Sequence, residues 1–148
     1  MILKIQTGEK NPILRKRSQP IKKIDEKLLK LARDMIETTN INNGLGLSAC
    51  QVGENIRMFI VLKELSDKNI FINPEIIKMS KKTDIIEEGC LSLSGIYLPT
   101  KRAKSLKIKA IDENDKEFKI KAKDLLARVI QHEIVHLNGV LITDHAED

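Results

Sequence analysis

A chain of 148 residues with 41% hydrophobic and 32% charged side chains is predicted to form one globular domain over residues 1–148. The same composition excludes a disordered or fibrous protein, and an aromatic content of 3% excludes a platform that stacks single-stranded nucleic acid. The formal charge of +5 favours loose association with anionic surfaces but requires none.

The start of the chain lacks the apolar segment of a secretion signal, because polar residues begin at Lys4. No stretch approaches the length that crosses a membrane, so we expect a cytoplasmic protein without membrane association. In that compartment, Cys50 and Cys90 are expected to be thiols or metal ligands rather than a disulfide.

The first predicted element is an amphipathic helix over residues 26–38. Asp25 is its candidate N-cap, and residues 40–44, rich in Asn and Gly, follow its end. Apolar residues recur along it at three- and four-residue spacing: Leu28, Leu29, Ala32, Met35 and Ile36.

Strands are predicted next. Residues 58–62 form a short, apolar run typical of a buried strand, whereas residues 71–77 are a weaker candidate because Pro74 interrupts them. A β-hairpin is predicted over residues 104–122, with its turn at residues 112–115 and one basic face that we interpret as a solvated edge. Its alternating apolar residues are Leu106, Ile108, Ala110, Phe118, Ile120 and Ala122.

The last predicted element is a helix that begins at Lys123 or Asp124 and continues through Leu137, where residues 138–139 (Asn-Gly) end it. Apolar residues surround it on nearly all sides. A helix of this kind is expected in the middle of a domain rather than on its surface.

This helix contains the sequence HEIVH at residues 132–136. His132 and His136 are one helical turn apart, so both imidazoles project from one face and can bind one divalent ion. Glu133 lies beside them, within reach of a water on that ion. The competing interpretation makes both histidines ordinary core residues, since a motif with three fixed positions also arises by chance.

A catalytic ion of this type needs a third protein ligand and a position left open for water. The extended metalloprotease pattern would place a third histidine where Ile142 stands, and His145 comes three residues too late. The thiols remain as candidates. Cys90 follows a possible strand over residues 83–87, and Cys50 lies in a loop after the first helix. The residues alone do not decide which of the two thiols is the third ligand.

Three segments together resemble the signature of peptide deformylases, which is GxGLAAxQ, EGCLS and QHExDHLxG in that order. Here they read GLGLSACQ at residues 44–51, EGCLS at residues 88–92 and QHEIVHLNG at residues 131–139. Three matches in the right order and spacing are far more specific than any one of them. The resemblance covers most of the chain, from residue 11 to residue 144.

This resemblance implies a metal-dependent hydrolase that removes the N-formyl group from formyl-methionyl nascent peptides and releases formate. It implies one divalent ion per chain, natively Fe²⁺, with Zn²⁺, Ni²⁺ or Co²⁺ able to replace it. The ligands would be Cys90, His132 and His136, with Cys50 a bystander. Oxidation of Fe²⁺ beside a thiolate is expected to make the site sensitive to oxygen.

The resemblance also assigns catalytic roles. Glu133 would take a proton from the water on the ion and deliver it to the departing amine. The Gln51 side chain and the Leu91 backbone N–H would stabilise the oxyanion that develops on the formyl oxygen.

The methionine side chain of such a substrate needs an unbranched apolar slot. Val129 and Leu125 lie one and two turns before His132 on its face of the helix, and the resemblance adds Leu45 and Ile86 to the pocket wall. Gly46 would let the substrate backbone lie close to the protein.

The chain departs from the family pattern at three places near the site. Val135 replaces an acidic residue that would support Arg102, so looser support is expected unless Glu88 pairs with that arginine. Ser48 replaces an alanine and is expected only to add a hydroxyl. Arg128 replaces an apolar residue, and a cation there is expected to shift preference among substrates.

Together, the elements and the resemblance imply an α+β fold in which mixed or antiparallel sheets pack around a central, buried helix that carries the HExxH motif. We expect a monomer that binds the formylated peptide and no specific nucleic acid. The long C-terminal helix of many members is absent here, so at most weak ribosome association is expected. The alternatives are an HExxH-type metallopeptidase and a non-catalytic metal-binding interaction domain. The second alternative would need Cys50 as a fourth ligand, because a structural site fills all four positions with protein ligands.

Overall fold

The computed structural model describes residues 1–145 of the chain. Its helices and strands, in chain order, are α1 (Pro12–Arg15), α2 (Glu26–Ile41), β1 (Gly46–Ser48), the 3₁₀ helix η1 (Ala49–Val52), β2 (Met58–Val61), β3 (Ile70–Met79), β4 (Thr83–Cys90), β5 (Leu93–Ala103), β6 (Ser105–Ile111), β7 (Glu117–Lys123), α3 (Asp124–Leu137) and the 3₁₀ helix η2 (Ile142–His145). Within these residues, no helix combines the length and hydrophobicity that a membrane span requires.

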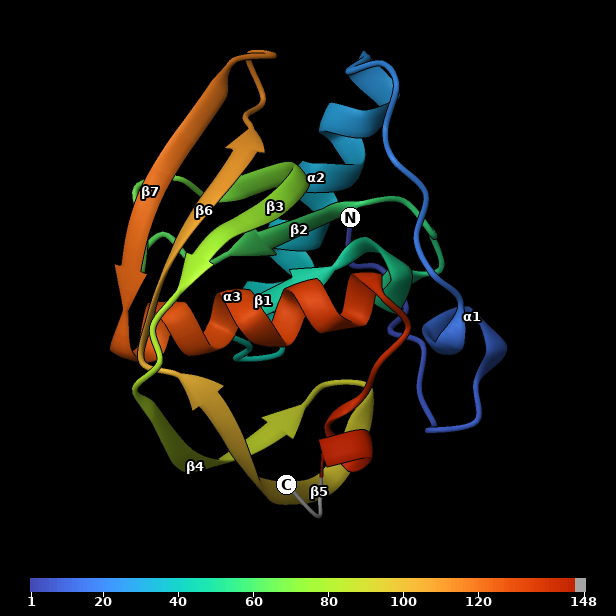
Figure 1. The fold of residues 1–148 in the computed structure, drawn as a ribbon. Helices are drawn as coiled ribbons and strands as arrows, with labels where there is room; N and C mark the ends of the chain where they lie inside the picture. The colour runs from blue at the N-terminus through green and yellow to red at the C-terminus, as the bar shows by residue number, and fades with distance from the viewer. Residues whose placement is uncertain (146–148) are drawn as a thin grey trace.

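The strands form two antiparallel sheets, which confirms the predicted α+β class. One sheet has five strands in the order β1-β2-β3-β6-β7, and the other consists of β4 and β5. In Figure 1, α3 runs across the molecule between the five-stranded sheet and the β4–β5 pair, and α2 lies behind β2.

Alternation along β2 distributes side chains between two cores. Phe59 is fully buried in a cluster with Val129 and Ile130 of α3, whereas Met58 and Ile60 belong to a cluster with Met35 of α2. Successive side chains of a strand point to opposite faces of its sheet. The five-stranded sheet is therefore covered by α3 on one face and, over β1 and β2, by α2 on the other.

Helix α2 begins where predicted but extends beyond the predicted end at residue 38. The Asp25 side chain accepts a hydrogen bond from the Leu28 N–H, as an N-cap does. Thr38 and Thr39 are fully buried, and their hydroxyls donate to carbonyls one turn earlier. These two residues are poor helix formers in isolation, and packing keeps them helical.

Strand β3 passes through Pro74, which had made it a weaker prediction. The strand is irregular there: its register against β6 shifts between Ile72 and Glu75, and Asn73 has a φ of 49°. The Asn73 side chain exchanges two hydrogen bonds with the Ile21 backbone, each 2.8 Å long. A bulge that is stabilised in this way lets a strand contain a proline without losing a ladder hydrogen bond.

The hairpin of β6 and β7 and helix α3 agree with the prediction to within one or two residues. Gly139 ends α3 with a φ of 78°, and a Cβ there would lie 2.4 Å from the Arg15 carbonyl oxygen. The Leu137 carbonyl at this end accepts from Ser18 N–H and from Arg57 Nη1. These contacts fix the end of α3 against the N-terminal segment.

Two expectations about loops were wrong. Cys90 is the last residue of strand β4, which pairs with β5 from Thr83 onward, and β5 itself was not predicted. Cys50 lies in η1, directly after β1, rather than in an irregular loop. Both cysteines are therefore positioned by regular structure.

Candidate metal centre and active site

A sulfur and two ring nitrogens meet where the end of β4 approaches α3. Cys90 Sγ lies 3.2 Å from His136 Nε2, which lies 3.2 Å from His132 Nε2. One donor atom from each residue lies within 4.8 Å of the others. The three donor atoms are close enough together to hold one metal ion.

Glu88 orients one of these imidazoles from behind. Its Oε1 lies 3.0 Å from His132 Nδ1, so a proton held at Nδ1 leaves the lone pair of Nε2 directed at Cys90 and His136. A carboxylate behind a histidine is a recurrent arrangement in metal sites. The donor set and its support therefore fit a divalent ion that accepts sulfur and nitrogen ligands.

Two arginines hold Glu88 in place. Arg102 donates to both carboxylate oxygens, from Nε and Nη2 at 3.1 Å each, and Arg128 Nη1 donates to Oε2. Burial would raise the pKa of Glu88, but its bonds with His132 and Arg102 outweigh burial and lower this pKa to about 2. Glu88 is therefore an anion at neutral pH.

Glu133 follows His132 and is buried, with only 3% of its surface exposed. Its Oε1 accepts a hydrogen bond from Ser48 Oγ at 2.9 Å, and the same hydroxyl lies 3.0 Å from the Glu133 carbonyl oxygen. Burial is the main reason why the pKa of Glu133 is raised. A carboxyl whose pKa is raised toward neutrality can both accept and release a proton.

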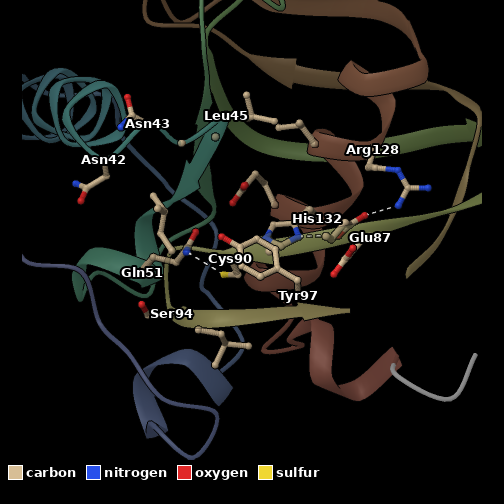
Figure 2. Close-up of a pocket in the computed structure, with 18 of the residues that line it drawn as sticks. Asn42, Asn43, Leu45, Gln51, Glu87, Cys90, Ser94, Tyr97, Arg128 and His132 are labelled. Carbon is tan, nitrogen blue, oxygen red and sulfur yellow. Dashed lines mark hydrogen bonds and ion pairs between the residues drawn. The ribbon is translucent and has the colours of Figure 1, made fainter. Parts of the chain in front are cut away.

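Gln51 reaches the cluster from η1. Its Oε1 accepts from the Ser48 N–H, and its Nε2 lies 3.0 Å from Ser92 Oγ and 3.6 Å from Cys90 Sγ. Figure 2 shows Cys90 between Gln51 and His132. Leu91 follows Cys90 in the turn between β4 and β5. An amide donor and a turn backbone thus flank the sulfur.

A pocket of about 650 Å³ opens over this cluster. All five residues predicted for the substrate wall line it, together with Gln51, Cys90, Leu91, His132 and Glu133. Those five are Leu45, Gly46, Ile86, Leu125 and Val129. Figure 2 places Leu45 and Tyr97 at this pocket with Cys90.

The polypeptide deformylase family model matches residues 2–148. The chain belongs to the peptide deformylase family. Peptide deformylases are metal-dependent hydrolases that remove the N-formyl group from nascent peptides, and membership assigns this activity to the chain.

Individual peptide deformylases agree with the family model. The enzyme from Dictyoglomus thermophilum is 49% identical over 92% of this chain and 88% of its own length. Peptide deformylase 1 from Clostridium perfringens is also 49% identical, over 90% of each chain. The crystal structure from Thermotoga maritima superposes with a TM-score of 0.94 at 38% identity, covering 100% of this chain and 99% of that one.

A second solved structure carries an inhibitor. Peptide deformylase from Synechococcus elongatus, crystallised in complex with actinonin, has a TM-score of 0.93 and 35% identity. The match covers 99% of this chain and 79% of that one.

The structure separates the two thiols that the residues alone left undecided. Cys90 belongs to the donor cluster, whereas Cys50 is fully buried and its Sγ contacts the His136 carbonyl oxygen at 3.6 Å. Burial raises the pKa of the Cys50 thiol to about 12, so it stays protonated.

Arg128 lines the pocket, as expected, but its charge is paired within the protein, and its effect on substrate preference stays a prediction. The guanidinium is buried and donates to Glu88, to the Thr100 carbonyl and to both the carbonyl and carboxylate of Asp84. Its charge is neutralised by β4, so it is not a free cation for the substrate. The alternative expectation, that Glu88 pairs with Arg102, agrees with the structure.

Sequence reasoning missed two residues of the site. The Ser48 hydroxyl was expected to do little but bonds the Glu133 carboxylate. Tyr97 was given no role, yet its ring packs over Gly89, where a Cβ would lie 2.5 Å from a ring carbon. Tyr97 was not predicted because its strand, β5, was not predicted. For Ser48 a signal was available, since a hydroxyl replaces the family's alanine beside a catalytic motif.

Proposed function

We propose that Cys90, His132 and His136 bind one divalent ion and that Glu133 moves the proton during deformylation. The observation that carries this proposal is the cluster in which the Cys90 sulfur lies beside His136 Nε2 and His136 Nε2 lies beside His132 Nε2, with one donor atom of each residue within 4.8 Å of the others. Three protein ligands leave room for water and substrate, as a catalytic ion requires. In this proposal α3 is the central helix of a single catalytic domain that spans the chain.

When bound, the ion supplies Lewis acidity, which polarises the formyl carbonyl and acidifies water. Glu133 takes the proton of the attacking water at its carboxylate and later delivers it to the departing amine. The hydrogen bond from Ser48 fixes the direction of that carboxylate. The Gln51 amide and the Leu91 backbone N–H donate to the formyl oxygen as negative charge develops on it.

The substrate's methionine side chain occupies the apolar part of the pocket. Leu125 and Ile86 are about half exposed, at 48% and 50%, and offer apolar surface to a ligand, while Val129 is buried beneath. Leu45 completes the wall. At Gly46, a Cβ would lie only 3.0 Å from the Ile60 carbonyl, so the absence of a side chain also keeps β1 close to β2 and α3.

We propose Fe²⁺ as the native ion, because a thiolate with two imidazoles is a ligand set that iron accepts, with Zn²⁺, Ni²⁺ and Co²⁺ as replacements. We further propose that the protein acts as a monomer on formyl-methionyl peptides and associates weakly with ribosomes. A non-catalytic closed site is disfavoured, since the Cys50 sulfur lies outside the donor cluster.

The test is formate release by protein purified without oxygen and loaded with Fe²⁺, Co²⁺ or Ni²⁺. A formyl-methionyl peptide is compared with the same peptide lacking the formyl group. We expect formate from the first and no internal cleavage of the second. Glu133→Gln should abolish release while metal content is retained, and Glu64→Gln, at an exposed position outside the pocket lining, should leave both unchanged.

Cleavage of the unformylated peptide would support the metallopeptidase alternative instead. Full activity of Glu133→Gln would contradict the role given to this carboxylate.

A further inference from the structure

The lysines of the β6–β7 hairpin form rows across three strands. Directly opposed residues of antiparallel strands lie on the same face of the sheet. The register pairs Lys107 with Lys121 and with Lys78 of β3, and pairs Lys109 with Lys119. With Lys123, these residues make a lysine face: Lys78, Lys107, Lys109, Lys119, Lys121 and Lys123.

This face holds most of the net charge of the protein. Its paired positions add two acidic residues, Glu75 and Glu117, so the face carries a formal charge of +4 out of +5 for the whole chain. The remainder of the molecule is therefore close to neutral. The positive charge is concentrated on one sheet face rather than spread over a solvated surface.

The arrangement costs stability in the isolated protein. Like charges placed directly opposite each other in a sheet repel. Within residues 1–145, Lys109 is the member of the face with ion pairs, to Glu75 at 3.5 Å and Glu117 at 3.9 Å, and the other five lysines make none. A multiply charged anion would relieve this repulsion.

The lysine face points away from the pocket. Leu106, Ile108 and Ala122, on the opposite face of the same strands, pack with α3 in the core. Helix α2 covers β1 and β2 and does not extend over the hairpin, which stands apart from it in Figure 1. A partner bound to the lysine face would thus leave the active site open.

We propose that the lysine face binds the phosphate backbone of structured RNA. Along one strand, lysines two residues apart are separated by about 7 Å, and lysines paired on neighbouring strands are separated by about 5 Å. A partner that matches this spacing must carry closely spaced negative charges. The paired residues on this face include no aromatic ring, so bases are not stacked and recognition is independent of sequence. The choice of RNA rests on the proposed function, which brings the enzyme to new polypeptides and hence to the RNA of the translation machinery.

The test is fluorescence anisotropy of a labelled double-stranded RNA titrated with the full-length, metal-loaded enzyme at several salt concentrations. The row variant is Lys78→Gln/Lys107→Gln/Lys121→Gln. The matched control is Lys10→Gln/Lys27→Gln/Lys63→Gln, which removes the same charge at exposed positions elsewhere. We expect the row variant to bind about a hundredfold more weakly near physiological salt, with its salt slope reduced by about 3.

Equal loss in both triple variants would overturn the proposal, because net charge alone would then explain binding. So would absence of RNA binding by the unmodified enzyme, or tighter binding to anionic phospholipid vesicles than to RNA under the same salt. Formate release from a short formylated peptide should be unchanged in the row variant. Loss of formate release with intact RNA binding would count against the proposed function and not against this surface.

Discussion

Arg128 of α3 and Glu88 of β4 form a buried ion pair, with Nη1 2.5 Å from Oε2. The same guanidinium bonds Asp84 and the Thr100 carbonyl, so one side chain of α3 holds both strands of the β4–β5 sheet. Cys90 lies on that sheet, whereas His132 lies on the helix. The pair therefore sets the position of the sulfur relative to the imidazoles.

Replacing Arg128 with Met is expected to weaken metal binding by about 10- to 100-fold, the usual effect of removing support behind a ligand. The measurement is metal affinity by competition with a chromophoric chelator. Arg33→Met, which breaks the exposed pair with Glu26, is the control and should bind metal normally. Unchanged affinity in Arg128→Met would show that the sheet is held by other contacts.

Arg102→Ala tests the other partner of Glu88. It removes two hydrogen bonds to the carboxylate and leaves Glu88 with Arg128 and His132. We expect faster metal loss on dialysis against a chelator and lower formate release, because a freed carboxylate no longer fixes the His132 ring. Retention of metal and activity at the level of the unmodified protein would contradict this role.

Glu88 should make the stability of the metal-free protein depend on acid pH. Its pKa is about 2 in the folded protein, against an ordinary value of 4.5. The stabilisation of about 3 kcal/mol is thus fully present above pH 4.5 and is lost as the pH falls toward 2. Urea unfolding of Glu88→Gln should vary less over this window, whereas Glu87→Gln should follow the unmodified protein.

The Ser48 hydroxyl should affect the pH profile of the enzyme. Its hydrogen bond lowers the pKa of Glu133 against the opposing effect of burial. Ser48→Ala is therefore expected to move the rising limb of formate release to higher pH, since it removes a hydrogen bond that favours the charged form of Glu133. Thr39→Val removes another buried hydroxyl and should leave the profile in place. An unshifted profile in Ser48→Ala would show that the hydroxyl only fills space.

The elements predicted well from sequence are those that local patterns specify. Alternation in β6 and β7 and the apolar, Gly-terminated run of α3 each determine one structure without reference to distant residues. The helix face of His132 indicated Leu125 and Val129, and the resemblance added Leu45, Gly46 and Ile86; all five line the pocket.

What could not be predicted depends on contacts between distant residues. Strand β5, which contains Gly95 and Pro99, was not predicted. Its partner β4 was predicted only as a possible strand over residues 83–87, because it exposes Ile85 and Ile86 instead of alternating. They form because they pair with each other, and in a two-stranded sheet every strand is an edge that tolerates proline. The ion pairs of Arg128 were not predicted for the same reason, since their partners are 40 or more residues away.

The measurement that tests the account most directly is X-ray absorption at the metal edge of the anaerobically loaded enzyme. The account predicts one sulfur neighbour, at about 2.3 Å if the ion is zinc, together with two imidazoles and one or more light oxygen neighbours. The sulfur signal should vanish in Cys90→Ala and persist in Cys50→Ala. A second sulfur, or a sulfur signal that survives loss of Cys90, would contradict the proposed centre.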